Sequence, residues 1–135
     1  MKKLIDILFL FFSTTLAAQT DSSFQFVKTI KGDIVSFTVD NLDNIYLLSS
    51  SNQVKKLNAN GDSMAIFNDV KKFGQASLID VSNPLKVLLY YRDFATIVVL
   101  DRLLNVRNTI DLRKQDILQA RAVGQSYDNK IWLYD

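Results

Sequence analysis

The chain has 135 residues and a formal net charge of +2, and it contains no His, no Cys and no Glu. Without His or Cys there is no imidazole base, no thiolate nucleophile, no disulfide and no His or Cys metal site. A charge this close to neutral argues against binding to nucleic acid or to an anionic membrane. All fourteen acidic residues are Asp, which favours turns over helix interiors, so the composition predicts an all-β fold rich in turns.

The N-terminus has the order of a secretory signal peptide. Two lysines follow the initial Met, residues 4–16 are mainly apolar, and Ala17 and Ala18 are small. A membrane-spanning helix needs about 20 apolar residues, more than this stretch provides. We therefore expect residues 1–18 to be cleaved, leaving a secreted, periplasmic or envelope domain at 19–135 with no membrane span.

The mature chain begins with short apolar runs separated by turn residues. These runs predict strands at 24–30, 34–39, 45–48, 53–57 and 64–67. Ile45–Leu48 is nearly continuous, which is typical of a strand covered on both faces. Between the last two strands, Asn60-Gly61 predicts a type I′ hairpin turn with positive φ at both residues.

The same plan then recurs with a period of 42–44 residues. Ile45, Val87 and Ile131 hold equivalent places, and so do Leu57 and Leu100. A period of this length that holds four short strands is the signature of a β-propeller blade. The expected blade units are about 34–69, 76–111 and 120–135.

These units amount to about two and a half four-stranded antiparallel blades. Propellers close with about four to eight blades, so we expect the chain to be a fragment of a longer protein. A complete small β-sandwich or β-meander is the alternative. Between the second and third units, residues 111–120 contain helix formers after a capping Asp111, which predicts a short helical turn.

The stretch Thr38–Tyr46, followed by Lys56–Gly61, resembles the units of secreted β-propeller repeat proteins of the NHL-like or YWTD-like kind in the broad sense. The resemblance covers roughly residues 24–135, although the YWTD tetrapeptide itself is absent. It implies that partners bind to inter-strand loops on one face of the propeller. The residues implied are Ser51, Asn52, Gln53, Lys71, Lys72, Tyr91, Arg92, Asp93 and Phe94.

No motif for catalysis or for a cofactor is present. The four glycines form no nucleophile elbow, dinucleotide-binding loop or P-loop. Asn58–Asp62 faintly resembles a calcium loop but lacks the bidentate Glu, so we expect a hairpin turn there instead. Trp132 and the tyrosines could stack on sugars, although their spacing favours core packing.

We therefore expect a non-enzymatic binding or scaffolding module, with no metal and no cofactor, for a protein or glycan partner. The alternative is the N-terminal part of a secreted or periplasmic propeller enzyme that acts on glycans, with its catalytic residues beyond residue 135.

Overall fold

The computed structural model of the chain describes residues 25–68 and 70–135. The predicted signal peptide lies outside these residues. The described elements are β1 (Ile34–Val39), β2 (Ile45–Ser49), β3 (Val54–Leu57), β4 (Ser63–Phe67), α2 (Val70–Phe73), β5 (Leu78–Asn83), β6 (Lys86–Tyr91), η1 (Arg92–Phe94), β7 (Thr96–Asp101), β8 (Val106–Asp111), η2 (Leu112–Gln115), β9 (Ala122–Gln125) and β10 (Ile131–Tyr134).

The strands form three antiparallel sheets in which neighbours in sequence are neighbours in space. Sheet A has the order β1-β2-β3-β4, sheet B the order β5-β6-β7-β8, and sheet C pairs β9 with β10. The prediction of an all-β fold with four-stranded antiparallel sheets is therefore confirmed. The predicted strands between residues 34 and 67 match those of sheet A to within one residue.

The predicted strand at 24–30 is wrong, because residues 25–30 form no strand. A strand needs the N–H and C=O groups of a neighbour, and within residues 25–68 and 70–135 β1 pairs only with β2. The segment is instead tied to sheet A through a side chain, since Lys28 Nζ donates to the carbonyl of Asn60 at 3.0 Å.

Five hairpin turns share one geometry. The first residue of each accepts the N–H of the fourth, which has a positive φ, and the first residue's own N–H donates to the fifth. This is a type I turn followed by a left-handed residue, a common three-residue hairpin loop. These turns begin at Asp40, Ser49, Asn58, Asp101 and Ser126.

The predicted type I′ turn at Asn60-Gly61 is therefore wrong. Of the two residues only Gly61 has a positive φ, at 79°, and its N–H donates to the carbonyl of Asn58. The turn begins at Asn58, one residue earlier than predicted, because the Asn58 side chain accepts the N–H of Asp62 at 2.8 Å and so favours a longer loop. The expectation of a hairpin rather than a calcium loop at Asn58–Asp62 agrees with this geometry.

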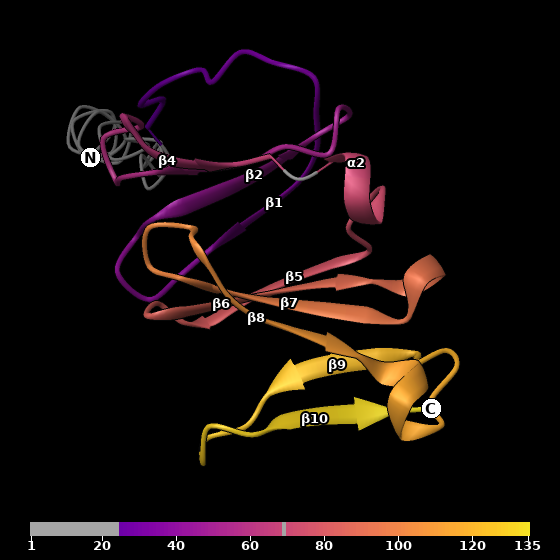
Figure 1. Cartoon of the computed structure of the whole chain (residues 1–135). Helices are drawn as coiled ribbons and strands as arrows, with labels where there is room; N and C mark the ends of the chain where they lie inside the picture. Colours follow the sequence, from indigo (N-terminus) through magenta and orange to yellow (C-terminus); the bar gives the residue numbers. More distant parts are fainter. Residues whose placement is uncertain (1–24, 69) are drawn as a thin grey trace, which may run out of the picture.

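The three sheets are stacked face to face, with sheet B in the middle (Figure 1). In β6, Val87, Leu89 and Tyr91 face a core shared with sheet A. The alternate residues Leu88 and Tyr90 face a second core shared with sheet C. Because both faces of β6 are buried, its sequence is a continuous apolar run rather than an alternating one.

The sheets approach one another most closely along their first strands. β1 lies beside β5, and β5 lies beside β9 (Figure 1). Short helical segments connect the sheets: α2 links sheet A to sheet B, and η2 links sheet B to sheet C. The predicted helical turn at 111–120 is confirmed by η2, whose Asp111 side chain accepts the N–H of Arg113.

We predict that Leu89→Ala destabilises the chain by about 2–5 kcal/mol, because Leu89 is fully buried between sheets A and B. Leu85→Ala is the matched control, since Leu85 is 66% exposed in the β5–β6 turn. It should change the free energy of unfolding by less than about 0.5 kcal/mol. Urea unfolding followed by circular dichroism measures both, and equal losses would contradict this packing.

Candidate functional site

The sequence-predicted binding residues all lie at one end of the stack. Antiparallel connectivity places the β2–β3 turn, α2 and η1 at the same end, together with η2 (Figure 1). We call this the loop end. The opposite end, called the turn end, carries the turns that begin at Asp40, Asn58, Asp101 and Ser126.

At the loop end, Tyr91 is buried whereas Arg92, Asp93 and Phe94 are exposed. The Tyr91 ring lies 5.2 Å from the ring of Phe73, between centroids, so it packs α2 onto sheet B. Its position fits a role in holding the loop end together rather than in direct contact with a partner. Lys72 is exposed on α2 beside it, and Lys71 lies in the same short helix.

The predicted residues Ser51, Asn52 and Gln53 form a self-contained turn. The Ser51 hydroxyl lies 2.8 Å from that of Ser49, and the Gln53 N–H donates to Ser49 Oγ at 3.1 Å. Asn52 takes the left-handed position, with a φ of 63°. Most of the polar groups here therefore serve the hairpin. The exception is Asn52 Oδ1, which is buried and has no hydrogen-bond partner among the described residues.

A cavity of about 350 Å³ lies beside η1, lined by Arg92, Gln119, Ala120 and Arg121. Its rear wall is fixed, because the buried Tyr90 hydroxyl donates to the carbonyl of Ala120 at 2.9 Å. Neither guanidinium makes a hydrogen bond or an ion pair with the described residues. Sequence reasoning found Arg92 but missed Arg121, which approaches it only once sheets B and C are packed.

A buried polar cluster lies at the turn end, where β1 meets β2. One Asp40 carboxylate oxygen accepts the N–H groups of Leu42 and Asn44, each at 2.9 Å. The Asn44 side-chain amide donates to the other oxygen at 2.8 Å, and the Tyr46 hydroxyl donates to it at 3.1 Å. Burial alone would raise the pKa of Asp40, but these hydrogen bonds outweigh it and lower the pKa below its ordinary value.

The same cluster keeps Tyr46 protonated. Burial, the negative charge of Asp40 and the hydrogen bond to it together raise the pKa of Tyr46 well above its ordinary value. A general acid or base works best with a pKa near the working pH, but the pKa of Asp40 is lowered and that of Tyr46 is raised, both away from neutrality. The cluster is therefore a structural one.

Lys56 is buried beside this cluster and links sheet A to sheet B. Its ammonium group donates to the carbonyl of Arg102, in the β7–β8 turn, at 3.1 Å. It also lies 5.2 Å from the centre of the Tyr46 ring, within cation–π range. A buried lysine usually marks either a reactive amine or a structural contact, and these two partners favour the structural contact.

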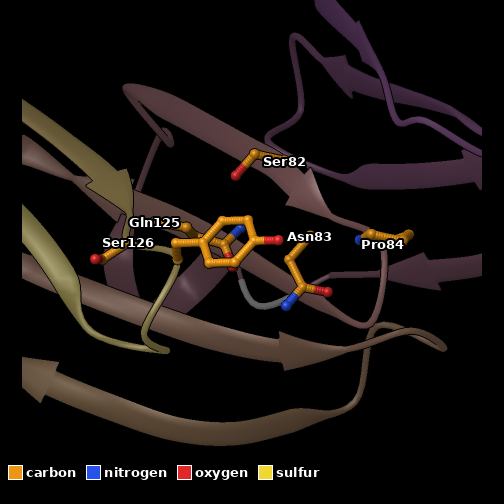
Figure 2. Close-up of a pocket in the computed structure, with 6 residues that line it drawn as sticks. Ser82, Asn83, Pro84, Gln125 and Ser126 are labelled. Carbon is orange, nitrogen blue, oxygen red and sulfur yellow. The ribbon is translucent and has the colours of Figure 1, made fainter.

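A second pocket, of about 410 Å³, lies at the turn end between sheets B and C. We call it the turn-end pocket. Figure 2 shows Gln125 between Ser126 on one side and Asn83 on the other. The remaining lining residues are Ser82, Pro84 and Tyr127. Sequence reasoning missed this pocket because its two walls, the β5–β6 turn and the end of β9, are some 40 residues apart in the chain.

Hydrogen bonds between the sheets hold the rear of this pocket. The Gln125 N–H donates to Asp80 Oδ2 at 2.6 Å, and the Gln125 side-chain amide donates to the carbonyl of Lys86 at 3.0 Å. Lys86 Nζ in turn donates to Asn129 Oδ1 at 2.7 Å. Burial alone would raise the pKa of Asp80, but hydrogen bonds from Ser82 and Gln125 lower it below its ordinary value.

Residues 25–68 and 70–135 contain no cluster of three or more Asp side chains able to hold a metal ion. Within the same residues, no helix is both long and apolar enough to cross a membrane.

No protein-family model matches the chain, and no curated protein matches it in sequence.

We predict that Asp40→Asn destabilises the chain by about 2 kcal/mol at neutral pH, because the ionised carboxylate accepts several buried hydrogen bonds. The folded pKa of Asp40 is lowered, so its contribution is complete above the unfolded pKa of about 4 and is lost as the pH falls through the folded value. The wild-type and variant unfolding energies should therefore converge in acid.

Asp101→Asn is the matched control for this prediction. Asp101 accepts the N–H groups of Leu103 and Asn105 in the same turn geometry, but the turn is exposed and no tyrosine donates to it. In urea titrations at the same pH, Asp101→Asn should lower the free energy of unfolding by less than Asp40→Asn does. Equal losses would show that the buried cluster adds nothing to the turn. A loss for Asp40→Asn that persists in acid would contradict a role for the ionised carboxylate.

Proposed function

We propose that the chain is part of an exported β-propeller-type binding module, whose three sheets serve as successive blades and whose loop end contacts the partner. Binding without catalysis is proposed, because the buried titratable groups described above are committed to structural contacts. Export is proposed from the N-terminal sequence alone.

The arrangement of the first strands supports the blade assignment. In a propeller, the first strand of each blade lies nearest the central axis, so consecutive first strands lie side by side. β1, β5 and β9 lie side by side in this order. They border a groove of about 380 Å³ that is lined from all three sheets, by residues that include Thr38, Ile79 and Val123.

The two outer faces of the stack also support the assignment of the sheets as blades. On the outer face of sheet A the exposed side chains include Phe37, Met64 and Ile66, and on that of sheet C they include Trp132 and Tyr134. Apolar sheet faces of this kind are normally covered by another layer. Further blades would cover both.

The cavity beside η1 is the observation that carries the binding proposal. Arg92 and Arg121 both line this cavity and have no ion-pair partner among the described residues, and Phe94, 42% exposed, lies in η1 with Arg92. Arginine and aromatic side chains are enriched in protein interfaces, and guanidinium groups bind carboxylates in a bidentate manner. The partner surface we propose is therefore acidic, with an apolar contact for Phe94.

We predict that a photo-cross-linking residue placed at Phe94 captures this partner when the full chain is expressed in its native host. Leu85, exposed at the opposite end, is the control position and should give no adduct. The double variant Arg92→Gln/Arg121→Gln should reduce the Phe94 adduct about tenfold, and added salt should do the same.

Arg102→Gln is the matched charge control, since Arg102 is exposed in the β7–β8 turn. It should leave the yield of the Phe94 adduct unchanged. An adduct that forms equally at both positions, or that is insensitive to the arginine pair, would exclude the loop end as the binding surface.

We predict that the exported product begins at Ala18 or Gln19, because signal peptidase accepts small residues at the end of the apolar stretch. Intact-mass analysis of the envelope and medium fractions measures this. Leu8→Asp/Leu10→Asp should retain the uncleaved chain in the cytoplasm, whereas Ser22→Ala, beyond the expected cleavage site, should not. A full-length chain in the exported fraction would contradict cleavage.

A further inference from the structure

The turn-end pocket lies at the opposite end of the stack from the proposed partner surface. Its walls are the β5–β6 turn, with Ser82, Asn83 and Pro84, and the end of β9, with Gln125 and Ser126 (Figure 2). A volume of about 410 Å³ lies within the range of small-molecule sites. Because the inter-sheet hydrogen bonds of Gln125 hold its rear wall, the pocket exists before any ligand arrives.

The pocket presents polar groups without net charge. None of the six lining residues is an Asp, Lys or Arg. The nearest charged groups have their own partners: Asp80 accepts from Gln125, Lys86 donates to Asn129, and Lys130 pairs with Asp128 at 2.7 Å. The charge of Lys86 is not offset by a carboxylate, because Asn129 is neutral, but Lys86 is not one of the residues that line the pocket.

Gln125 leaves one strong acceptor unused. Its side-chain nitrogen donates to the backbone carbonyls of Asp80 and Lys86, at 3.2 and 3.0 Å, which fixes the orientation of the amide. The amide oxygen, Oε1, is buried and has no hydrogen-bond partner among the described residues. Because this oxygen is buried, the hydroxyl groups of a ligand would hydrogen-bond instead to the exposed side-chain amide of Asn83 at the pocket wall.

Tyr127 supplies an aromatic surface at the same pocket. Its side chain is fully exposed, although it lines the pocket together with Asn83 and Gln125. An exposed aromatic ring offers an apolar face for stacking, and its hydroxyl offers a hydrogen bond. An aromatic ring beside amides and hydroxyls, without charge, matches a ligand that has both an apolar face and several hydroxyl groups.

We propose that the turn-end pocket binds a small neutral saccharide, stacked on Tyr127 and hydrogen-bonded to the side-chain amide of Asn83. A sugar ring carries C–H groups on one face and hydroxyls around its edge, and each hydroxyl can both donate and accept. The site goes beyond the proposed partner surface, because it uses different residues at the other end of the stack.

The test is titration of the full chain with neutral disaccharides (maltose, cellobiose and di-N-acetylchitobiose), followed by nuclear magnetic resonance. At least one should bind, with shifts at Asn83, Gln125 and Tyr127. Tyr127→Ala should weaken binding about tenfold, and Tyr127→Phe, which keeps the ring, should stay within about threefold of wild type. Neither change should unfold the chain, because the side chain is exposed.

Trp132→Ala is the matched control, since Trp132 is exposed on β10 outside the pocket. It should leave binding unchanged. Absence of binding by all three disaccharides, equal losses for Tyr127→Ala and Trp132→Ala, or binding of a charged sugar phosphate in their place would each overturn the proposal. The variant Arg92→Gln/Arg121→Gln should bind the disaccharide normally, so failure of the partner surface and failure of this pocket are distinguished.

Discussion

The structure depends on the burial of β6 on both of its faces. Val87 and Leu89 pack toward sheet A, and Leu88 and Tyr90 pack toward sheet C, so one strand belongs to two cores. Burial of apolar area is the main stabilising term for a chain that has no cysteine and so no disulfide. The pockets at both ends follow from this stacking, because each lies where two sheets meet at the end of a shared core.

Most of the strands could be predicted from the sequence because their signals are local. The continuous apolar run of β2 and the Asp- and Asn-rich turn before it contain all the information needed to place that hairpin. The two errors concern pairing and geometry. The expected strand at 24–30 has the alternation of apolar and polar residues typical of a strand, but no strand in the described part of the chain pairs with it. At Asn60-Gly61, the side chain of Asn58 selected a longer loop than the dipeptide alone suggests.

The candidate sites were predictable only in part, because they depend on which turns become neighbours. Ser51 to Gln53 and Arg92 to Phe94 could be assigned to one end from strand alternation alone. The approach of Arg121 to Arg92, and of Gln125 to Asp80, depends on the packing of sheet C against sheet B. The periodicity of the sequence does not encode how sheets B and C pack. Tyr91 shows a second limit, because it lies at the predicted end of the stack but is buried against Phe73 of α2.

The polar side chains discussed above therefore form two groups: those whose hydrogen bonds are made within the fold, and those with donors or acceptors left over. The turns at Asp40 and Asp101 direct carboxylates onto their own backbone, which leaves little capacity for a ligand. Arg92 and Arg121 at one end, and Gln125 Oε1 at the other, retain capacity that folding did not use. The buried Gln125 Oε1 costs stability because it has no donor, whereas the two exposed guanidinium groups are hydrated until a partner displaces the water. We therefore propose different chemistry for the two ends: anionic groups at the loop end and neutral hydroxyl groups at the turn end.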